Sequence, residues 1–287
     1  MTDETKQTIK ETIDDTVEAA EETVRHPFIR SLSRFGFYTK GVLYIIIGVL
    51  AILLVIGLQG GKIADPTGAL GTIAQKPYGK ILLIIFIVGG SSYGLWNILR
   101  GAADVDDAGT DWMGIIKRII YVGIGFFYIG LALTAWSIIF STDVSGANSK
   151  LPKTITSVLL ALPLGVIIVF IIGISLIGTS LHECYAGISG KFQENYRSWE
   201  IKGWHQTFIK ILGVLSFTAR AVIFALMGYF FISAAINYNA DEAVGLDGAL
   251  LTLAQSSYGK LLLFVTSVGL VCHGILAFYE AHYRRIC

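Results

Sequence analysis

Several ionisable side chains of this sequence occur in surroundings where charge is costly. They are His182, Glu183, His273, Glu280 and Arg100, and each lies within or directly beside a long apolar run. A charge at the centre of a membrane costs at least ~2.5 kcal/mol, so such groups are expected to pair, to reach toward the headgroups or to line a wet cavity. They predict a polar vestibule that relays protons or binds an ion. The alternative interpretation is that they anchor helix ends at the headgroups.

Two amides, Gln75 and Gln255, could contribute to the same ion path because they occupy one position of a duplicated segment. GALGTIAQKPYGK begins at Gly68 and GALLTLAQSSYGK begins at Gly248, with nine of thirteen positions identical. Each copy lies between two apolar runs. We expect a short helix followed by a turn, which either lies flat at the outer interface or dips inward as the half-helix of a pore or binding site.

The elements that must position these residues are six apolar windows. Each has no charged side chain for at least 18 residues: 41–61, 81–99, 119–142, 154–181, 221–240 and 261–279. A helix rises ~1.5 Å per residue, so each window can cross a hydrocarbon core of ~30 Å. The windows are apolar on every face and lack the alternation typical of barrel strands. With 54% apolar residues in the chain, they predict an all-α integral membrane six-helix bundle.

The windows recur as pairs. At an offset of 180 residues Lys40 matches Arg220, Gly48 matches Gly228 and Gly94 matches Gly274. A weaker copy lies between them, in which Lys117, Tyr121 and Gly125 repeat Lys40, Tyr44 and Gly48, and Pro163 and Gly165 repeat Pro77 and Gly79. The sequence therefore predicts three tandem transmembrane hairpins. The same alignment places Arg100 opposite Glu280, which predicts an ion pair between repeats.

The predicted organisation follows from these repeats. Its segments are an acidic cytoplasmic amphipathic tail (1–33), repeat 1 (34–104), a diverged repeat 2 (111–187), a cytoplasmic linker with an interfacial helix (188–213) and repeat 3 (214–285). The tail carries apolar residues on one face and an excess of acidic residues elsewhere, which is typical either of a partly disordered cytosolic segment or of one that docks a partner or self-associates. A homo-oligomer or a membrane complex is the expected assembly, and no nucleic-acid partner is expected.

The two GALxxLAQ segments and the paired windows resemble a bacterial membrane family catalogued as domain of unknown function 1206. Members of that family are similar in having tandem two-helix units with a GALxxLAQxxxG segment between the helices. The resemblance covers Arg34 to Arg284, and the middle unit departs from it at Ala161 and Val166. It implies the fold and implies no particular activity.

Basic residues predict the orientation in the membrane. Of the 22 Lys and Arg residues, 16 lie in the N-terminal tail, the second and fourth loops and the C-terminal tail. Because cytoplasmic segments carry the excess of Lys and Arg, both termini are expected in the cytoplasm of a bacterial plasma membrane.

Recognisable catalytic motifs are lacking. The sequence shows no nucleophile with a convincing base, no phosphate loop and no paired-carboxylate site. His182, Glu183, Cys184, Cys272 and His273 share no metal-ligand spacing, so no metal or other cofactor is expected. The predicted function is a non-enzymatic structural or scaffold protein of the membrane. A small channel or transporter is the alternative, and an enzyme acting on lipid is a third and weaker hypothesis.

Overall fold

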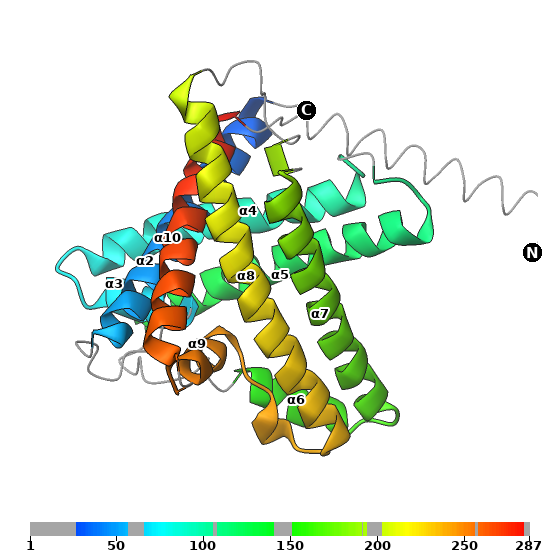
Figure 1. The fold of residues 1–287 in the computed structure, drawn as a ribbon. Coiled ribbons are helices and arrows are strands. Elements are labelled where there is room, and N and C mark those ends of the chain that lie inside the picture. Colours follow the sequence, from blue (N-terminus) through cyan, green and yellow to red (C-terminus); the bar gives the residue numbers. More distant parts are fainter. Residues whose placement is uncertain are drawn as a thin grey trace, which may run out of the picture.

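The computed structural model describes residues 27–56, 66–105, 108–140, 151–190, 192–193, 203–255 and 258–283. All regular structure in these residues is helical (Figure 1). The acidic segment 1–26, predicted to be an amphipathic helix that docks a partner, lies outside the described residues.

Six of the described helices are long and apolar enough to cross a membrane. They are α2 (Pro27–Val55), α4 (Gly79–Ala102), α5 (Trp112–Phe140), α7 (Gly165–Ser189), α8 (Trp204–Ile236) and α10 (Gly259–Tyr283). The first hairpin is α2 and α4, the middle hairpin is α5 and α7, and the third hairpin is α8 and α10. The shorter elements α3 (Pro66–Ala74), α6 (Leu151–Leu160), η2 (Ala240–Glu242) and α9 (Leu246–Gln255) lie within the hairpins. The predicted all-α membrane fold with six spans is confirmed.

Two of the long helices begin far ahead of their apolar windows. α2 starts at Pro27, a residue suited to the first helical position, and α8 starts at Trp204. The interfacial helix predicted within 188–213 is therefore the first part of α8, and Ile209 and Leu212 in it are buried. A charge-free window shows which part of a helix could lie in the hydrocarbon core. The helix itself extends beyond its window, so charged residues next to the window lie well inside the helix.

The main packing joins helices of different hairpins (Figure 1). The most extensive contacts are those of α10 with α2, α4 with α5, and α7 with α8. Contacts within the first and third hairpins are smaller, and α5 and α7 of the middle hairpin make almost none with each other. The second helix of each hairpin thus packs on the first helix of the next, and the third hairpin closes back onto the first. The three hairpins form a ring.

Pairs of glycines lie where the helices of this ring cross. The pairs are Gly41 with Gly274 for α2 and α10, Gly94 with Gly125 for α4 and α5, and Gly173 with Gly228 for α7 and α8. A Cβ atom on any of them would lie 2.6–3.0 Å from the carbonyl oxygen of its partner. Small residues let helix backbones approach closely in lipid, where apolar side chains gain little from association. These contacts account for the close pairing of helices across hairpins.

The middle hairpin follows the repeat in a different register from the predicted one. Gly94 and Gly274, which are equivalent at the offset of 180, cross Gly125 and Gly41 respectively. Gly125 therefore corresponds to Gly41, seven residues from its predicted equivalent Gly48. The prediction was wrong because a shift of seven residues returns a helix to nearly the same face, so an apolar pattern fits both registers.

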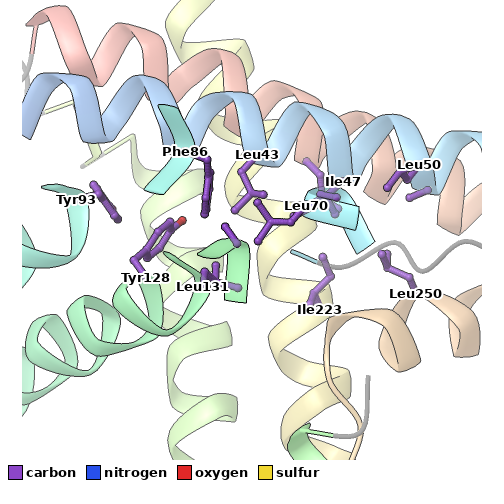
Figure 2. Close-up of a cluster of buried hydrophobic side chains, with 14 of the residues drawn as sticks. Leu43, Ile47, Leu50, Leu70, Phe86, Tyr93, Tyr128, Leu131, Ile223 and Leu250 are labelled. Atoms are coloured by element: carbon purple, nitrogen blue, oxygen red, sulfur yellow. The ribbon is translucent and has the colours of Figure 1, made fainter. Parts of the chain in front are cut away.

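The duplicated segment packs into the interior of the bundle. Leu70 of α3 and Leu250 of α9 are both 0% exposed and meet one cluster of buried side chains from the long helices (Figure 2). Members of that cluster include Leu43, Ile47, Leu131 and Ile223. α3 contacts α2, α4 and α5, while α9 contacts α8 and α10. The apolar face of each short helix is thus covered by protein, which fits both predicted arrangements.

Each hairpin turns into its second helix through an equivalent glycine. Cβ atoms on Gly79, Gly165 and Gly259 would lie 1.8–2.4 Å from a backbone carbonyl oxygen of the preceding short helix. Any side chain would therefore push that short helix away. The predicted equivalence of Gly165 with Gly79 is confirmed by this contact.

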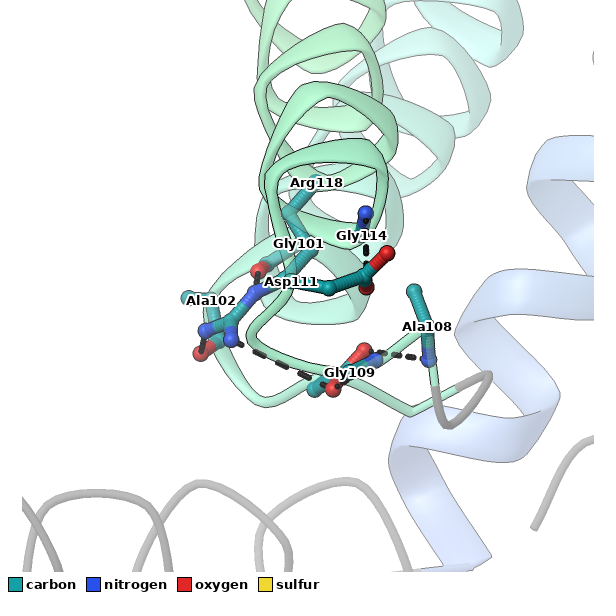
Figure 3. Close-up of polar contacts among 8 residues, drawn as sticks. Gly101, Ala102, Ala108, Gly109, Asp111, Gly114 and Arg118 are labelled. Carbon is teal, nitrogen blue, oxygen red and sulfur yellow. Dashed lines mark hydrogen bonds and ion pairs between the residues drawn. The ribbon is translucent and has the colours of Figure 1, made fainter.

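A compact turn joins the first hairpin to the middle one (Figure 3). Arg118 donates from Nε to the carbonyl of Gly101 at 2.8 Å and from Nη2 to that of Ala102 at 2.7 Å. Asp104 lies 4.0 Å from its guanidinium and accepts hydrogen bonds from two backbone N–H groups of the loop. The arginine satisfies carbonyls at the end of α4 that have no helical partner. It thereby fixes how α5 leaves α4.

Candidate functional site

Polar side chains from all six long helices meet in the interior of the bundle. This central polar cluster consists of Lys40 and Tyr44 of α2, Tyr93 of α4, Tyr128 of α5, Glu183 of α7, Ser216 and Arg220 of α8, and His273 and Glu280 of α10. Its charged and titratable members lie within electrostatic range of one another as a connected set. No single hairpin contains the whole cluster. Its side chains come together only because the three hairpins pack against one another as a ring.

Two ion pairs hold the charges of the cluster. Lys40 Nζ lies 3.3 Å from Glu280 Oε2, and Arg220 Nη2 lies 2.9 Å from Glu183 Oε1. Lys40 and Arg220 occupy the same position of the repeat, and each binds a carboxylate from the second helix of another hairpin. Because a buried charge without a partner is strongly destabilising, each pair ties one hairpin to another.

His273 is the most deeply buried titratable residue of the cluster, with 2% of its surface exposed. Its Nδ1 lies 2.7 Å from Ser216 Oγ, and the edge of the ring meets Tyr44 at a centroid distance of 4.5 Å. Nε2 is buried and has no hydrogen-bond partner in the described residues. Lys40 and Arg220 both lie within electrostatic range of the imidazole. In the described residues the imidazole is therefore held through Nδ1.

Tyrosines form the rest of the interior surface. Tyr93 and Tyr128 meet edge to face at a centroid distance of 4.6 Å, and Lys40 Nζ lies 5.4 Å from the centroid of Tyr93. This distance is within the range of a cation–π contact. The pair of Tyr93 and Tyr128 lies at the α4–α5 crossing, and the pair of His273 and Tyr44 lies at the α2–α10 crossing. The two pairs occupy equivalent positions in the repeat.

The structure brings together three of the residues that were predicted to form an ion path. Glu183, His273 and Glu280 belong to the central polar cluster. His182, by contrast, is exposed on α7. Gln75 and Gln255 are also exposed, at the ends of the short helices α3 and α9, and so do not face the cluster.

Arg100 lies between α4 and α5 and not beside its predicted partner. It donates from Nη2 to Tyr121 Oη at 3.1 Å, with its guanidinium 3.8 Å from the centroid of the Tyr121 ring. Glu280 pairs with Lys40. The prediction paired Arg100 and Glu280 because they are equivalent positions on the second helices of two hairpins. In the ring, however, the second helix of one hairpin packs on the first helix of the next hairpin.

Sequence reasoning missed the tyrosines, Ser216 and the partners of the two carboxylates. Both basic partners lie well inside their helices, since Lys40 follows Pro27 by 13 residues and Arg220 follows Trp204 by 16. Their shared position in the repeat was the available signal, because a basic residue that recurs within an apolar helix needs a partner of opposite charge.

No group of three or more His, Cys, Asp or Glu residues capable of holding a metal ion occurs in the described part of the chain. Within that part, the side chains of the central polar cluster are joined in pairs of opposite charge. Such pairs leave few carboxylate oxygens for a divalent cation.

Comparisons with known proteins agree with the repeat pattern. The family model described as "Domain of Unknown Function (DUF1206)" matches residues 35–104 and 215–284, which cover the first and third hairpins. The "Uncharacterized protein YxxB" of Bacillus subtilis (strain 168) is 29% identical over 260 residues, covering 91% of this chain and 93% of that protein. No solved structure matches the chain. Residues 35–104 and 215–284 therefore belong to the DUF1206 family, whose domain the chain carries twice.

Proposed function

We propose that this chain is a non-enzymatic structural protein of the membrane, whose ring of hairpins acts as a scaffold for other membrane components. The observation that supports this most directly is the pairing of its buried charges. Lys40 and Arg220 each bind a carboxylate of another hairpin, so the charges of the interior are balanced within the fold. A path for ions would keep charged groups available to the transported species.

The buried apolar side chains of the short helices α3 and α9 support the same proposal. Leu70 and Leu250 are fully buried among the long helices at the end of the bundle that carries the short helices. They place hydrocarbon between the central polar cluster and that end. Such packing at one end of the interior is what a structural protein needs and supports the scaffold over an open path.

The orientation and the location are part of the proposal. The distribution of Lys and Arg supports cytoplasmic termini in a bacterial plasma membrane. Exposed apolar side chains such as Ile119, Phe126, Ile171 and Leu181 on α5 and α7 would face lipid or another membrane protein. The middle hairpin, whose helices are the least buried of the six long helices, thus offers a surface for a second copy or a partner within the bilayer.

Liposomes containing the purified chain test the scaffold proposal. We expect no proton, potassium or chloride flux above that of protein-free liposomes, and recovery of the chain in a cross-linked oligomer or complex from native membranes. Flux that depends on the chain would contradict the proposal. A chain that cross-links to nothing in native membranes would contradict it as well.

A small channel or transporter is the second candidate, and one observation favours it. His273 Nε2 and Glu183 Oε2 are buried without hydrogen-bond partners in the described residues, as expected of groups that face a transported ion or water. The variant His273→Leu separates the candidates. Flux that is present in the parent chain and lost in His273→Leu would establish transport, whereas equal absence of flux in both supports the scaffold.

A further inference from the structure

The two helices of the middle hairpin stand apart. Each of the six long helices packs on the next one in the chain, and α10 packs back on α2, except that α5 and α7 make almost no contact with each other. α5 packs on α4, and α7 packs on α8. Figure 1 shows the first of these pairs running across the view and the second running down it. The middle hairpin is therefore open where the first and third hairpins are closed.

The first and third hairpins close through one equivalent contact. Gly89 of α4 lies so close to Thr39 of α2 that a Cβ atom on the glycine would overlap the threonine side chain. Gly269 of α10 meets Ala219 of α8 in the same way. The two pairs are related by the repeat offset of 180 residues. In each closed hairpin, a residue without a side chain thus packs against a small side chain.

The register of the middle hairpin shows which of its residues are equivalent to these pairs. The crossing at Gly125 places α5 at an offset of 84 residues from α2, and the turn at Gly165 places α7 at an offset of 86 residues from α4. A hydrogen bond supports the second offset. Ser180 Oγ donates to the carbonyl of Ala221 at 2.7 Å, and these two residues are equivalent to Gly94 and Gly125, which meet at the α4–α5 crossing.

The middle hairpin has a matching pair of small residues at these positions. Gly123 of α5 corresponds to Thr39, and Ser175 of α7 corresponds to Gly89. Here too the pair contains one glycine and one small side chain, with the glycine on the first helix and not on the second. Both residues are exposed, and a Cβ atom on Gly123 would have nothing within 4 Å. The middle hairpin therefore carries the contact of the other two in an unmade form.

We propose that the protein has a second state in which the middle hairpin closes and α5 packs on α7 through Gly123 and Ser175. The pairs α4–α5 and α7–α8 have more extensive contacts than α2 with α4 or α8 with α10, so each of the two pairs moves as a unit and the smaller contacts adjust. Closure completes the circle of packed helices around the central polar cluster, which includes residues of both moving pairs. This state goes beyond the proposed scaffold function and does not rest on it.

Disulfide trapping of the full chain in native membranes tests the closed state. In a chain whose native cysteines are replaced, Gly123→Cys and Ser175→Cys should cross-link within one molecule on mild oxidation, because a disulfide forms when the Cα atoms come within about 7 Å. The control is Gly130→Cys with Ser175→Cys. Gly130 lies about two turns from Gly123 on the same face of α5, and a Cβ atom there also has nothing within 4 Å.

We expect a yield for the Gly123 pair at least fivefold above that of the Gly130 pair. Equal yields would overturn the proposal. Cross-links of the Gly123 pair between two molecules in place of those within one would also overturn it, because another copy would then cover the open face of the middle hairpin.

A second cysteine pair reports closure and leaves the two small residues free to be changed. Ile120 and Thr179 occupy the positions of Ser216 and His273, whose side chains meet in the closed third hairpin. Ile120→Cys and Thr179→Cys should therefore cross-link within one molecule when α5 packs on α7. Failure of this pair to cross-link would contradict the closed state.

A swap of the small residues, in the chain that carries the second cysteine pair, tests the contact itself. Gly123→Ala places two side chains in the contact and should lower the cross-linking yield at least threefold. Gly123→Ala combined with Ser175→Gly reproduces the pair of Ala219 and Gly269 in the third hairpin and should restore the yield. An unchanged yield in Gly123→Ala, or no recovery in the double variant, would overturn the proposal.

Discussion

Gly41 and Gly274 lie against each other's backbones where the first and last spans cross. A Cβ atom on Gly274 would be 2.6 Å from the carbonyl oxygen of Gly41, and one on Gly41 would be 2.7 Å from that of Gly274. Residues 233 positions apart in the chain are thus in direct contact. The contact closes the ring of hairpins and brings His273, next to Gly274, into the central polar cluster.

The substitution Gly274→Ala should separate α2 from α10. Because the new methyl group meets backbone and not a flexible side chain, we expect a loss of roughly 1–3 kcal/mol in unfolding free energy, as for overpacked cores. Unfolding in mixed detergent micelles, followed by circular dichroism, measures it. Gly178→Ala is the matched control, since a Cβ atom there has nothing within 4 Å. Equal stability of the two variants would contradict the close crossing.

Removal of one partner from the α2–α10 ion pair should be strongly destabilising. Glu280→Gln leaves the ammonium of Lys40 in the interior without a carboxylate, which should cost about 3–5 kcal/mol. The double variant Lys40→Met, Glu280→Leu should recover most of this loss, because it removes both charges. Chemical unfolding of the parent chain and the two variants provides the comparison.

The ion pair between Lys153 and Asp241 is the control for that experiment. Their side chains are 44% and 85% exposed, and the charged atoms are 3.6 Å apart. Asp241→Asn should therefore change the unfolding free energy by less than about 1 kcal/mol. A loss as large as that of Glu280→Gln would show that burial does not set the importance of these pairs.

Truncation of the buried apolar side chain of α9 should weaken the whole bundle. Leu250→Ala removes a fully buried side chain of α9, with an expected cost of about 2–5 kcal/mol from lost burial and the cavity left behind. Leu251→Ala, the next residue along the same helix, changes a side chain that is 49% exposed and should be close to neutral. If the two variants unfold alike, α9 does not insert into the core.

The loop after α8 should open in acid. Ser233 and Asn237 donate hydrogen bonds to the carboxylate of Glu242, which lowers its pKa from the ordinary value of 4.5. A lowered pKa contributes stability that is present above pH 4.5 and is lost as the pH falls through the folded-state pKa. Amide hydrogen exchange at 238–245, corrected for intrinsic rates, should rise below that value. Glu242→Gln should abolish this pH dependence, and parallel profiles of variant and parent would contradict it.

The repeats made much of the fold predictable. Six apolar windows and the identities at the offset of 180 suffice for six spans and for the equivalence of the first and third hairpins. The glycine that begins the second helix was also recognisable in the middle hairpin, because Gly165 follows Pro163 as Gly79 follows Pro77.

The pairing of the hairpins was not predictable from the same pattern. Nothing local distinguishes a helix that packs on its own hairpin partner from one that packs on the next hairpin, so Glu280 was assigned to Arg100 when it binds Lys40. The tyrosines, Ser216 and the basic partners of the central polar cluster were missed for the same reason, since its members come from six helices. The predicted equivalence of Gly125 with Gly48 was wrong because a shift of seven residues keeps a residue on nearly the same face of a helix.

Disulfide cross-linking between the first and last spans tests the closed ring most directly. Tyr38 and Phe278 have ring centroids 5.8 Å apart. In a chain whose native cysteines are replaced, the pair Tyr38→Cys and Phe278→Cys should cross-link within one molecule in native membranes. Phe264→Cys, on the same helix but more than three turns away, should not cross-link to Tyr38→Cys. Absence of the first cross-link, or equal yields for the two pairs, would contradict a ring closed by α2 and α10.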